Sequence, residues 1–470
     1  MGAELTHLTL VQAAEAIAAR QVSSLEVVQA CLARIDKQQS VLNAFIAVDG
    51  EQGLQAAREA DAELARGRCR GPLHGVPLAH KDMFYRAGRV STCGSKILRD
   101  YVPHHTATVL RRLDAAGALE IGRLNMAEFA LGPTGHNEHF GHCRNPWNPE
   151  HITGGSSSGS GCAVAGRLVF GALGSDTGGS VRIPSAFCGV VGLKPTHGRV
   201  SRYGLMPVAF SLDQAGPLAR TVRDCARLAA VIAGADSDDP TASGEGVPDY
   251  EAGLERSVKG VRIGVPRAYF YDRVTGEVEQ AIAAAQEVFR GMGAEVLDVE
   301  LPDIQALQDV TNIIQAAEAA AVHRKWMAER PGDYSAQVLG RLQPGLYIPA
   351  TRYLEALALR GVMTERYLSD VFAKVDVLHI PGASFPAPSL AEADVRADPG
   401  YRELLFEVAR CTRPINFLGL PALGVPMGFS VGGLPLGFQL VGRPFAEGLL
   451  LNLGHLYQKE TGWHERAPAL

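Results

Sequence analysis

Residues 153–182 constrain the fold more than any other part of this chain. Two glycine-rich turns, TGGSSSGSG (153–161) and GSDTGGSVR (174–182), bracket a small-residue run at 162–165 that predicts a buried helix. Glycine permits backbone conformations and close approaches that other residues cannot make. Consecutive free N–H groups in such turns form a concavity for an anion or a developing oxyanion. Because both turns carry serines, the segment predicts a serine hydrolase site assembled from two loops.

The composition predicts a soluble globular protein. Of the 470 residues, 46% are apolar and 20% are charged, which is ordinary for a protein with a sizeable core. The net charge of −5 and the lack of a basic run argue against a nucleic-acid-binding surface. No signal peptide or apolar span is found, so we expect a cytoplasmic location and no membrane partner. A second copy of the chain is a candidate partner.

The eight cysteines are scattered and show no C-x-x-C spacing. We interpret them as reduced thiols of a cytosolic protein rather than as a disulfide framework.

Apolar periodicity predicts strands that alternate with helices. Predicted helices cover 9–19, 24–36, 51–66, 106–116, 222–233, 278–291, 313–327, 353–374 and 446–460, and predicted strands cover 73–82, 118–122, 261–265, 294–301 and 375–380. Residues 125–130 predict a short helical turn, 200–217 a loop-rich stretch, and 235–247 a polar surface linker. This alternation predicts an α/β sheet covered on both faces.

A serine nucleophile needs a base, and Lys81 is the strongest candidate. None of the 14 histidines lies in a recognisable triad context. Lys81 ends an apolar strand, where desolvation lowers the pKa of a lysine. A shift from about 10.4 to near neutrality requires roughly 4 to 5 kcal/mol of differential destabilisation of the charged form. The alternative is that Lys81 pairs with Asp82 or with a surface carboxylate.

Two rival sites are weighed against this one. Residues 155–159 match the G-x-S-x-G nucleophile elbow, with Ser157 as nucleophile, but the preceding 148–153 is a poor strand. His136, His139, His142 and Cys143 form H-x-x-H-x-x-H-C, a spacing that matches no common structural zinc pattern. We therefore favour pocket-lining or capping histidines and expect no metal.

Three separated motifs resemble the amidase signature family. They are GVPLAHKD (75–82), GGSS (154–157) and DTGGSVRIP (176–184), with Ser156 and Ser180 at the family's spacing of 24 residues. The resemblance extends through 192–196, 211–217, 414–416, 419–422 and 437–442, and it weakens between about 236 and 410. It implies the α/β amidase signature fold, with a large mixed central β-sheet covered by helices on both faces.

The resemblance also implies one amidase domain, 1–470, in four sections. These are N-terminal helical cladding (1–70), the catalytic signature core (71–235), a variable substrate-pocket region (236–410) and a C-terminal return to the core sheet (411–470).

The resemblance implies a Ser-cisSer-Lys triad that needs no cofactor. Ser180 would form the acyl-enzyme, Ser156 would sit on a cis peptide bond and relay protons, and neutral Lys81 would be the ultimate base. The backbone N–H groups of residues 177–180 (Thr177, Gly178, Gly179 and Ser180) would form the oxyanion hole, and Ala130 would lie near the substrate. Asp176 and Arg182 would anchor the second turn, with Ser157 beside the site; a surface ion pair is the alternative for the first two.

One branch of this family is the A subunit of the tRNA-dependent amidotransferase, which hydrolyses glutamine for a partner. Arg360, seven residues after Tyr353, falls where that protein has its glutamine-carboxylate arginine, although a helix-surface charge is an equal alternative. The aspartate that would hold the glutamine amino group is Ala409 here, and Ser158 replaces a glycine of the common Gly-Gly-Ser-Ser-Gly-Gly pattern. The absence of that aspartate counts against glutamine.

The resemblance therefore predicts a stand-alone amidohydrolase that cleaves the carbon–nitrogen bond of a small-molecule amide and releases a carboxylate and ammonia or an amine. The alternatives are a hydrolase of carbamates or aryl esters and the glutamine-hydrolysing component of the amidotransferase. A non-catalytic scaffold is disfavoured because Lys81, Ser156 and Ser180 are all present.

Overall fold

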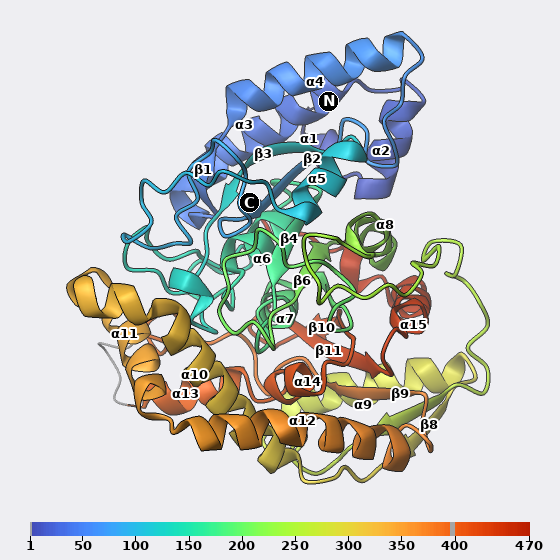
Figure 1. The fold of residues 1–470 in the computed structure, drawn as a ribbon. Helices are drawn as coiled ribbons and strands as arrows, with labels where there is room; N and C mark the ends of the chain where they lie inside the picture. Colours follow the sequence, from blue (N-terminus) through green and yellow to red (C-terminus); the bar gives the residue numbers. More distant parts are fainter. Residues whose placement is uncertain (1, 395–399) are drawn as a thin grey trace.

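A mixed β-sheet runs through the part of the chain that the computed structural model describes, residues 2–394 and 400–470 (Figure 1). Its 11 strands lie in the order β1-β3-β2-β4-β6-β5-β10-β11-β9-β7-β8. They are β1 (Phe45–Val48), β2 (Pro77–Lys81), β3 (Leu119–Leu124), β4 (Gly171–Ser175), β5 (Val191–Lys194), β6 (Ala215–Ala219), β7 (Arg262–Val265), β8 (Glu295–Asp298), β9 (Val377–Pro381), β10 (Ala422–Phe429) and β11 (Pro435–Gly442). The predicted α/β class with a large mixed sheet is confirmed.

Parallel pairs lie near the two ends of the sheet, and antiparallel pairs join them. Strand β2 runs parallel to β3 and β4, and β7 runs parallel to β8 and β9. Between these groups the hairpin β10–β11 is antiparallel to β5 on one side and to β9 on the other. The C-terminal hairpin therefore connects the two groups of strands.

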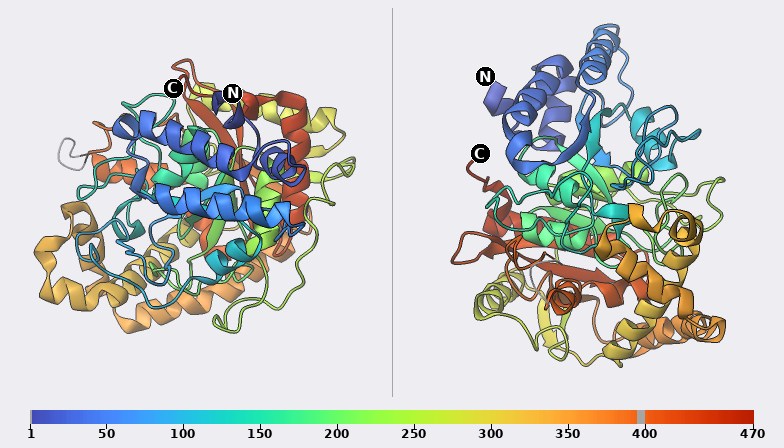
Figure 2. Two further views of the ribbon diagram at one scale, coloured as in Figure 1. Left: turned by 90° about the horizontal axis from the view of Figure 1, so that it is seen from above. Right: turned by 90° about the vertical axis from the view of Figure 1, so that its left-hand side faces the viewer.

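Helices cover both faces of the sheet (Figures 1 and 2). They are α1 (Gly2–Leu5), α2 (Leu10–Ala18), α3 (Ser24–Leu42), α4 (Gly50–Ala65), α5 (Thr108–Ala115), α6 (Ser158–Ala165), α7 (Arg182–Cys188), α8 (Val222–Ile232), α9 (Gly276–Gly291), α10 (Ile304–Glu329), α11 (Ala336–Leu342), α12 (Ala350–Asp370), α13 (Tyr401–Val408), α14 (Arg413–Leu418) and α15 (Glu447–Thr461), with 3-10 turns η1 (Glu128–Ala130), η2 (Pro331–Asp333), η3 (Gln343–Tyr347) and η4 (Trp463–Glu465). The long helix α10 packs against α11, α12 and α14. None of the helices in residues 2–394 and 400–470 combines the length and apolar character that crossing a membrane requires.

The front section of the chain shows how local signals place elements. Thr9 and Ser23 are the N-cap residues of helices α2 and α3, and each forms a capping box in which Gln12 or Glu26 returns the hydrogen bond. Helix α3 continues past the predicted end at residue 36. The section 1–70, predicted to be helical cladding, also contributes strand β1, which pairs with β3 at the sheet edge.

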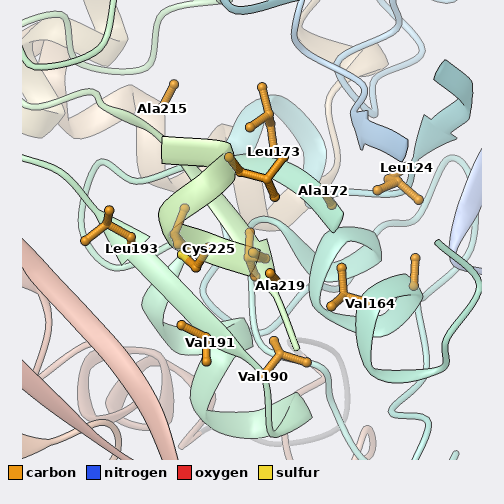
Figure 3. Close-up of a cluster of buried hydrophobic side chains, with 14 of the residues drawn as sticks. Leu124, Val164, Ala172, Leu173, Val190, Val191, Leu193, Ala215, Ala219 and Cys225 are labelled. Atoms are coloured by element: carbon orange, nitrogen blue, oxygen red, sulfur yellow. The ribbon is translucent and has the colours of Figure 1, made fainter. Parts of the chain in front are cut away.

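Small residues pack the centre of the sheet, around the two glycine turns. Figure 3 shows Ala172 and Leu173 of β4, Val191 and Leu193 of β5 and Ala215 and Ala219 of β6 gathered with Val164 of α6. All five residues of β4 and of β6 are buried. A β-carbon on Gly174 would lie only 2.7 Å from the Ser157 Oγ, so glycine is what lets this strand approach the first turn.

Candidate active site

Strand β2 carries Lys81 into the interior, beside the first glycine turn. The Lys81 Nζ donates hydrogen bonds to Ser156 Oγ at 2.6 Å and to Ser175 Oγ at 2.8 Å. Burial lowers the pKa of Lys81 to about 7, against the opposing influence of the Asp176 and Asp213 carboxylates. A large fraction of this buried amine is therefore neutral at physiological pH.

The predicted alternative, an ion pair between Lys81 and Asp82, is not formed. The Asp82 carboxylate instead accepts hydrogen bonds from the backbone N–H of Thr92 at 2.8 Å and from its hydroxyl at 2.5 Å. Within residues 2–394 and 400–470, no carboxylate oxygen lies within 4 Å of the Lys81 amine. The lysine is thus left to its two serine partners.

The first turn places Ser156 against this amine. The peptide bond between Gly155 and Ser156 is cis, as the family resemblance implies. A β-carbon on Gly155 would lie 2.3 Å from the Gly132 carbonyl oxygen, which explains why the residue before Ser156 is glycine. The Ser156 carbonyl oxygen accepts a hydrogen bond from the N–H of Ala127 at 3.1 Å.

Ser157 does not form a nucleophile elbow. Its side chain is fully buried, and its hydroxyl donates to the Ser175 carbonyl oxygen at 3.3 Å. Residues 148–153 contribute only isolated bridges and no strand, which removes the structural context that an elbow requires.

The second turn follows β4 and is held by the Asp176 carboxylate. This carboxylate accepts hydrogen bonds from the N–H groups of Gly179 at 2.8 Å and Val181 at 3.1 Å. Arg182 donates to both carboxylate oxygens, at 3.1 and 3.0 Å, and to Asn416 Oδ1 at 2.6 Å. Because Asp176 and Arg182 are both 0% exposed, the alternative of a surface ion pair is wrong.

The charge of Asp176 is retained in spite of its burial. Burial on its own would raise the pKa of this carboxyl, but the Arg182 charge and the hydrogen bonds to it outweigh burial and hold the pKa at about 2. The second turn is therefore organised around a permanent buried charge pair.

We expect the loss of Arg182 to be far more costly than the loss of a matched exposed arginine. Arg182→Met leaves Asp176 buried and unpaired, which should lower the free energy of unfolding by about 3 to 5 kcal/mol. Arg262→Met breaks a similar pair with Asp376, but its side chains are 36% and 35% exposed, so about 0 to 1 kcal/mol is expected. Urea unfolding measures both values; equal losses would contradict this role for Arg182.

The predicted oxyanion donors are not equivalent. The N–H of Gly179, one of the four predicted donors, is engaged by Asp176. Ala130, predicted only to lie near the substrate, donates its N–H to the Ala127 carbonyl oxygen at 2.9 Å. The N–H groups of Thr177, Gly178 and Ser180 have no acceptor among the described residues. These three remain available for a developing oxyanion.

Ser180 is the accessible serine of the three. Its residue is partly exposed, whereas Ser156 and Ser157 are buried. The N–H of Ser157 donates to the Ser180 carbonyl oxygen at 3.3 Å and so joins the two turns. The Ser180 hydroxyl makes no hydrogen bond in the part of the chain that the structure describes, so the predicted contact with Ser156 is not formed; such contacts are often loose without substrate.

Thr412 completes the second turn, and sequence reasoning missed it. Its hydroxyl donates to the Gly178 carbonyl oxygen at 2.7 Å. A β-carbon on Gly179, whose φ is +127°, would lie 2.1 Å from the same hydroxyl oxygen, so only glycine fits.

Other supporting residues also escaped a prediction. Ser175 binds Lys81, Asp213 accepts from the Thr177 hydroxyl at 2.5 Å, and Asn416 and Gln439 hold Asp176 and Arg182. A polar residue inside an otherwise apolar or glycine-rich buried run is the signal that could have found Ser175 and Gln439.

The histidines of the loop after Ala130 contact backbone groups and one carboxylate. The Nε2 of His136 lies 3.1 Å from the Leu390 carbonyl oxygen, and the Nε2 of His139 lies 3.0 Å from Glu128 Oε1. The Nδ1 of His142 accepts a hydrogen bond from the N–H of Asn137. In residues 2–394 and 400–470, no group of three or more potential ligands is placed to hold a metal ion.

Arg360 contacts backbone that lies outside the two glycine turns. Its Nη1 donates to the Ser211 carbonyl oxygen at 2.6 Å, and its Nη2 lies against Gly419. None of its contacts with other described residues brings it to the turn at 174–182. The prediction that Arg360 binds a substrate carboxylate therefore has no contact to support it.

Comparison with known proteins identifies the family of this site. A family model described as Amidase matches residues 26–451, most of the chain. The chain belongs to the amidase signature family. Proteins with several different names align with nearly the whole of this amidase-family chain.

Among curated relatives, the A subunit of the glutamyl-tRNA(Gln) amidotransferase of Roseiflexus sp. (strain RS-1) is 43% identical over 489 residues, covering 99% of each chain. A crystal structure described as that of an amidase is 36% identical with a TM-score of 0.86, covering 96% of this chain and 100% of the other. The structure of the corresponding glutamyl-tRNA(Gln) amidotransferase protein from Thermotoga maritima is 31% identical with a TM-score of 0.84, covering 99% of this chain and 97% of the other.

These relatives bear on the expected partners of this amidase-family chain. The first is named as one component of an enzyme that is itself named for a tRNA. The comparisons therefore do not support the expectation of a chain that meets only small molecules and no nucleic acid.

Proposed function

We propose that this chain is an amidohydrolase that cleaves the carbon–nitrogen bond of a small amide through Ser180, Ser156 and Lys81. The observation that carries the proposal is the hydrogen bond of 2.6 Å from a buried Lys81, with its pKa lowered to about 7, to Ser156 on the cis peptide bond. A neutral amine can accept a proton, whereas a lysine with an ordinary pKa cannot. The partly exposed Ser180 lies in the adjoining turn.

The chemistry follows from the order of these groups. Ser180 attacks the amide carbonyl while its proton passes to Ser156 and a proton of Ser156 passes to Lys81. The N–H groups of Thr177, Gly178 and Ser180 stabilise the tetrahedral oxyanion, each such donor contributing roughly 10²–10³ in rate. The same path then returns a proton to the departing nitrogen, which cannot leave as an amide anion. Water repeats the cycle on the acyl-enzyme.

A second candidate is the glutamine-hydrolysing A subunit of an amidotransferase. The curated relatives favour this assignment over a stand-alone enzyme, because the Roseiflexus protein of that name is 43% identical over the whole chain. Against it stands Ala409, which is 2% exposed and offers no carboxylate for the amino group of glutamine. Hydrolysis of a carbamate or an aryl ester would use the same acyl-enzyme chemistry.

A substrate panel separates these candidates. The purified chain is assayed against aliphatic and aryl amides, carbamates, aryl esters and glutamine, with ammonia, amine or phenol release as the readout. Turnover of amides by the chain alone supports the stand-alone enzyme. Ammonia release from glutamine that appears only when the other components of the amidotransferase are added would establish the second candidate instead. No turnover of any of these substrates under either condition would refute the hydrolase proposal.

The pH dependence reports on Lys81. Because only the neutral amine accepts a proton, kcat/KM should rise with pH and reach half of its plateau near pH 7. Asp213 also titrates in this region, since burial raises its pKa to about 6. Asp213→Asn removes that titrating group. It also removes a negative charge that raises the pKa of Lys81, so the rise of kcat/KM that remains should move to lower pH. A flat profile from pH 5 to 9 with a neutral substrate would contradict Lys81 as base.

A further inference from the structure

Two arginines line a cavity beside the second glycine turn. The cavity has a volume of about 290 Å³ and is bounded by α10, α11, α13 and α14, and its lining residues are Asn312, Gly340, Arg341, Tyr401, Leu405, Phe406 and Arg413. Figure 1 places α10, α11 and α13 together on one side of the molecule. The mechanism described above uses neither arginine.

Neither guanidinium has a carboxylate partner within the described residues. Arg413 is 7% exposed, its Nη1 donates to Asn312 Oδ1 at 3.3 Å, and its Nε is buried without a partner. Arg341 is partly buried and makes no hydrogen bond or ion pair with any residue in the described ranges. Buried charges are ordinarily paired with an opposite charge, so the buried Arg413, with a second arginine beside the same cavity and no carboxylate partner, is an unusual arrangement.

The arginines also raise the electrostatic cost of their own burial. Burial and, to a smaller extent, the positive charge of Arg341 together lower the pKa of Arg413 to about 10. An anion in the cavity would offset both effects. The planar fork of a guanidinium fits a carboxylate with two parallel hydrogen bonds.

The cavity adjoins the proposed reaction centre. The Nε of Arg413 lies 3.6 Å from the position that a β-carbon on Gly178 would occupy. Gly178 carries one of the three available N–H groups and is two residues from Ser180, a separation of at most about 7 Å between Cα atoms. An anion on Arg413 therefore lies a few carbon atoms from a carbonyl bound at Ser180.

We propose that the acyl part of the substrate carries a carboxylate, which Arg413 and Arg341 bind. This inference rests on the proposed amidohydrolase function and narrows its substrates to monoamides of short dicarboxylic acids and compounds of the same shape. The positive cavity disfavours an additional ammonium group, and the buried Ala409, four residues before Arg413, cannot balance one. Glutaramate, which is glutamine without its amino group, is then a better substrate than glutamine.

Matched pairs of substrates test the carboxylate. The values of kcat/KM are compared for the monoamides of succinic, glutaric and adipic acid, for butyramide and pentanamide, for the methyl ester of glutaramic acid, and for glutamine. The best monoamide should exceed the neutral amides and the ester at least tenfold. Arg341→Met should reduce this ratio at least tenfold, and Arg341→Lys should retain part of it.

Arg352→Met is the matched control. Arg352 lies on α12 with its side chain 63% exposed and pairs with Glu355, so the ratio should not change in this variant. If Arg341→Met lowers kcat/KM for charged and neutral substrates by the same factor, the arginine is purely structural and the inference is overturned.

A binding measurement separates this inference from the proposed function. Glutarate is titrated calorimetrically into Ser180→Ala and into the double variant with Arg341→Met, which needs no turnover. Binding to the first that weakens at least tenfold in the second supports the anion site even if no amide is hydrolysed. Equal hydrolysis of charged and neutral amides, together with no glutarate binding, leaves an amidohydrolase and overturns the carboxylate site.

Discussion

Ser180→Ala is expected to lower kcat by roughly 10⁴-fold or more, because the acyl-enzyme cannot form without the hydroxyl. The side chain is partly exposed and makes no hydrogen bond to the described residues, so its loss should leave the fold unchanged. Activity on the best amide of the panel measures the effect. Mass spectrometry after treatment with a sulfonyl fluoride or phosphonate should place the adduct on the peptide that contains Ser180 in the parent protein.

A buried serine of the same segment provides the control. Ser160→Ala removes a hydroxyl that donates to the Leu173 carbonyl oxygen at 3.0 Å and touches no proposed reacting group. It should cost stability of about 0.5 to 1.5 kcal/mol and little activity. Retained activity in Ser180→Ala, or an adduct on Ser157, would refute the assignment of the nucleophile.

Lys81→Met is expected to reduce kcat by roughly 10³-fold or more, since the proposed relay then has no terminal base. Methionine keeps most of the side-chain volume in a site that is 1% exposed. The hydroxyls of Ser156 and Ser175 lose a partner, which should cost about 1 to 3 kcal/mol of unfolding free energy. A domain of ordinary stability, about 5 to 15 kcal/mol, remains folded after that loss.

The combination of measurements distinguishes a base from a structural lysine. Urea unfolding gives the stability change, and kcat on folded protein gives the catalytic change. The residual activity of Lys81→Met should also lack the rise of kcat/KM around pH 7. Normal kcat in a destabilised variant would show that Lys81 only supports the first turn.

Periodicity and capping signals predicted the longer helices and several of the apolar strands of this fold, but not the short helices α1, α7, α11, α13 and α14. The stripe of α3, its cap at Ser23 and the alternation of β7, α9 and β8 are all visible in the residue pattern. Strands β4 and β6 were missed because GALGS and AGPLA are rich in glycine and small residues, which have low strand preference. Close approach of neighbouring backbones, visible only in three dimensions, is what makes small residues necessary there: a β-carbon on Gly216 would lie 2.0 Å from the Leu193 carbonyl oxygen.

The site residues that lie in sequence motifs could be predicted, and those contributed by distant segments could not. Lys81, Ser156 and Ser180 stand in recognisable patterns, and the structure brings Lys81 against Ser156. Thr412 and Arg413 lie more than 200 residues from the turn that they contact, in a stretch without a pattern of its own. The engagement of the Gly179 N–H by Asp176 depends on the conformation of one turn, which composition does not specify.

The proposed centre depends on residues that are synthesised long after its signature motifs. Strand β10 pairs with β5, and β11 pairs with β9. Asn416 and Gln439 hold the charge pair of the second glycine turn. A growing chain that already contains Lys81, Ser156 and Ser180 still lacks these supports for more than 200 residues. The contacts of Asn416 and Gln439 therefore form late in biosynthesis, and a chain interrupted before β11 carries all three signature residues without Gln439 and without the strand that pairs with β9.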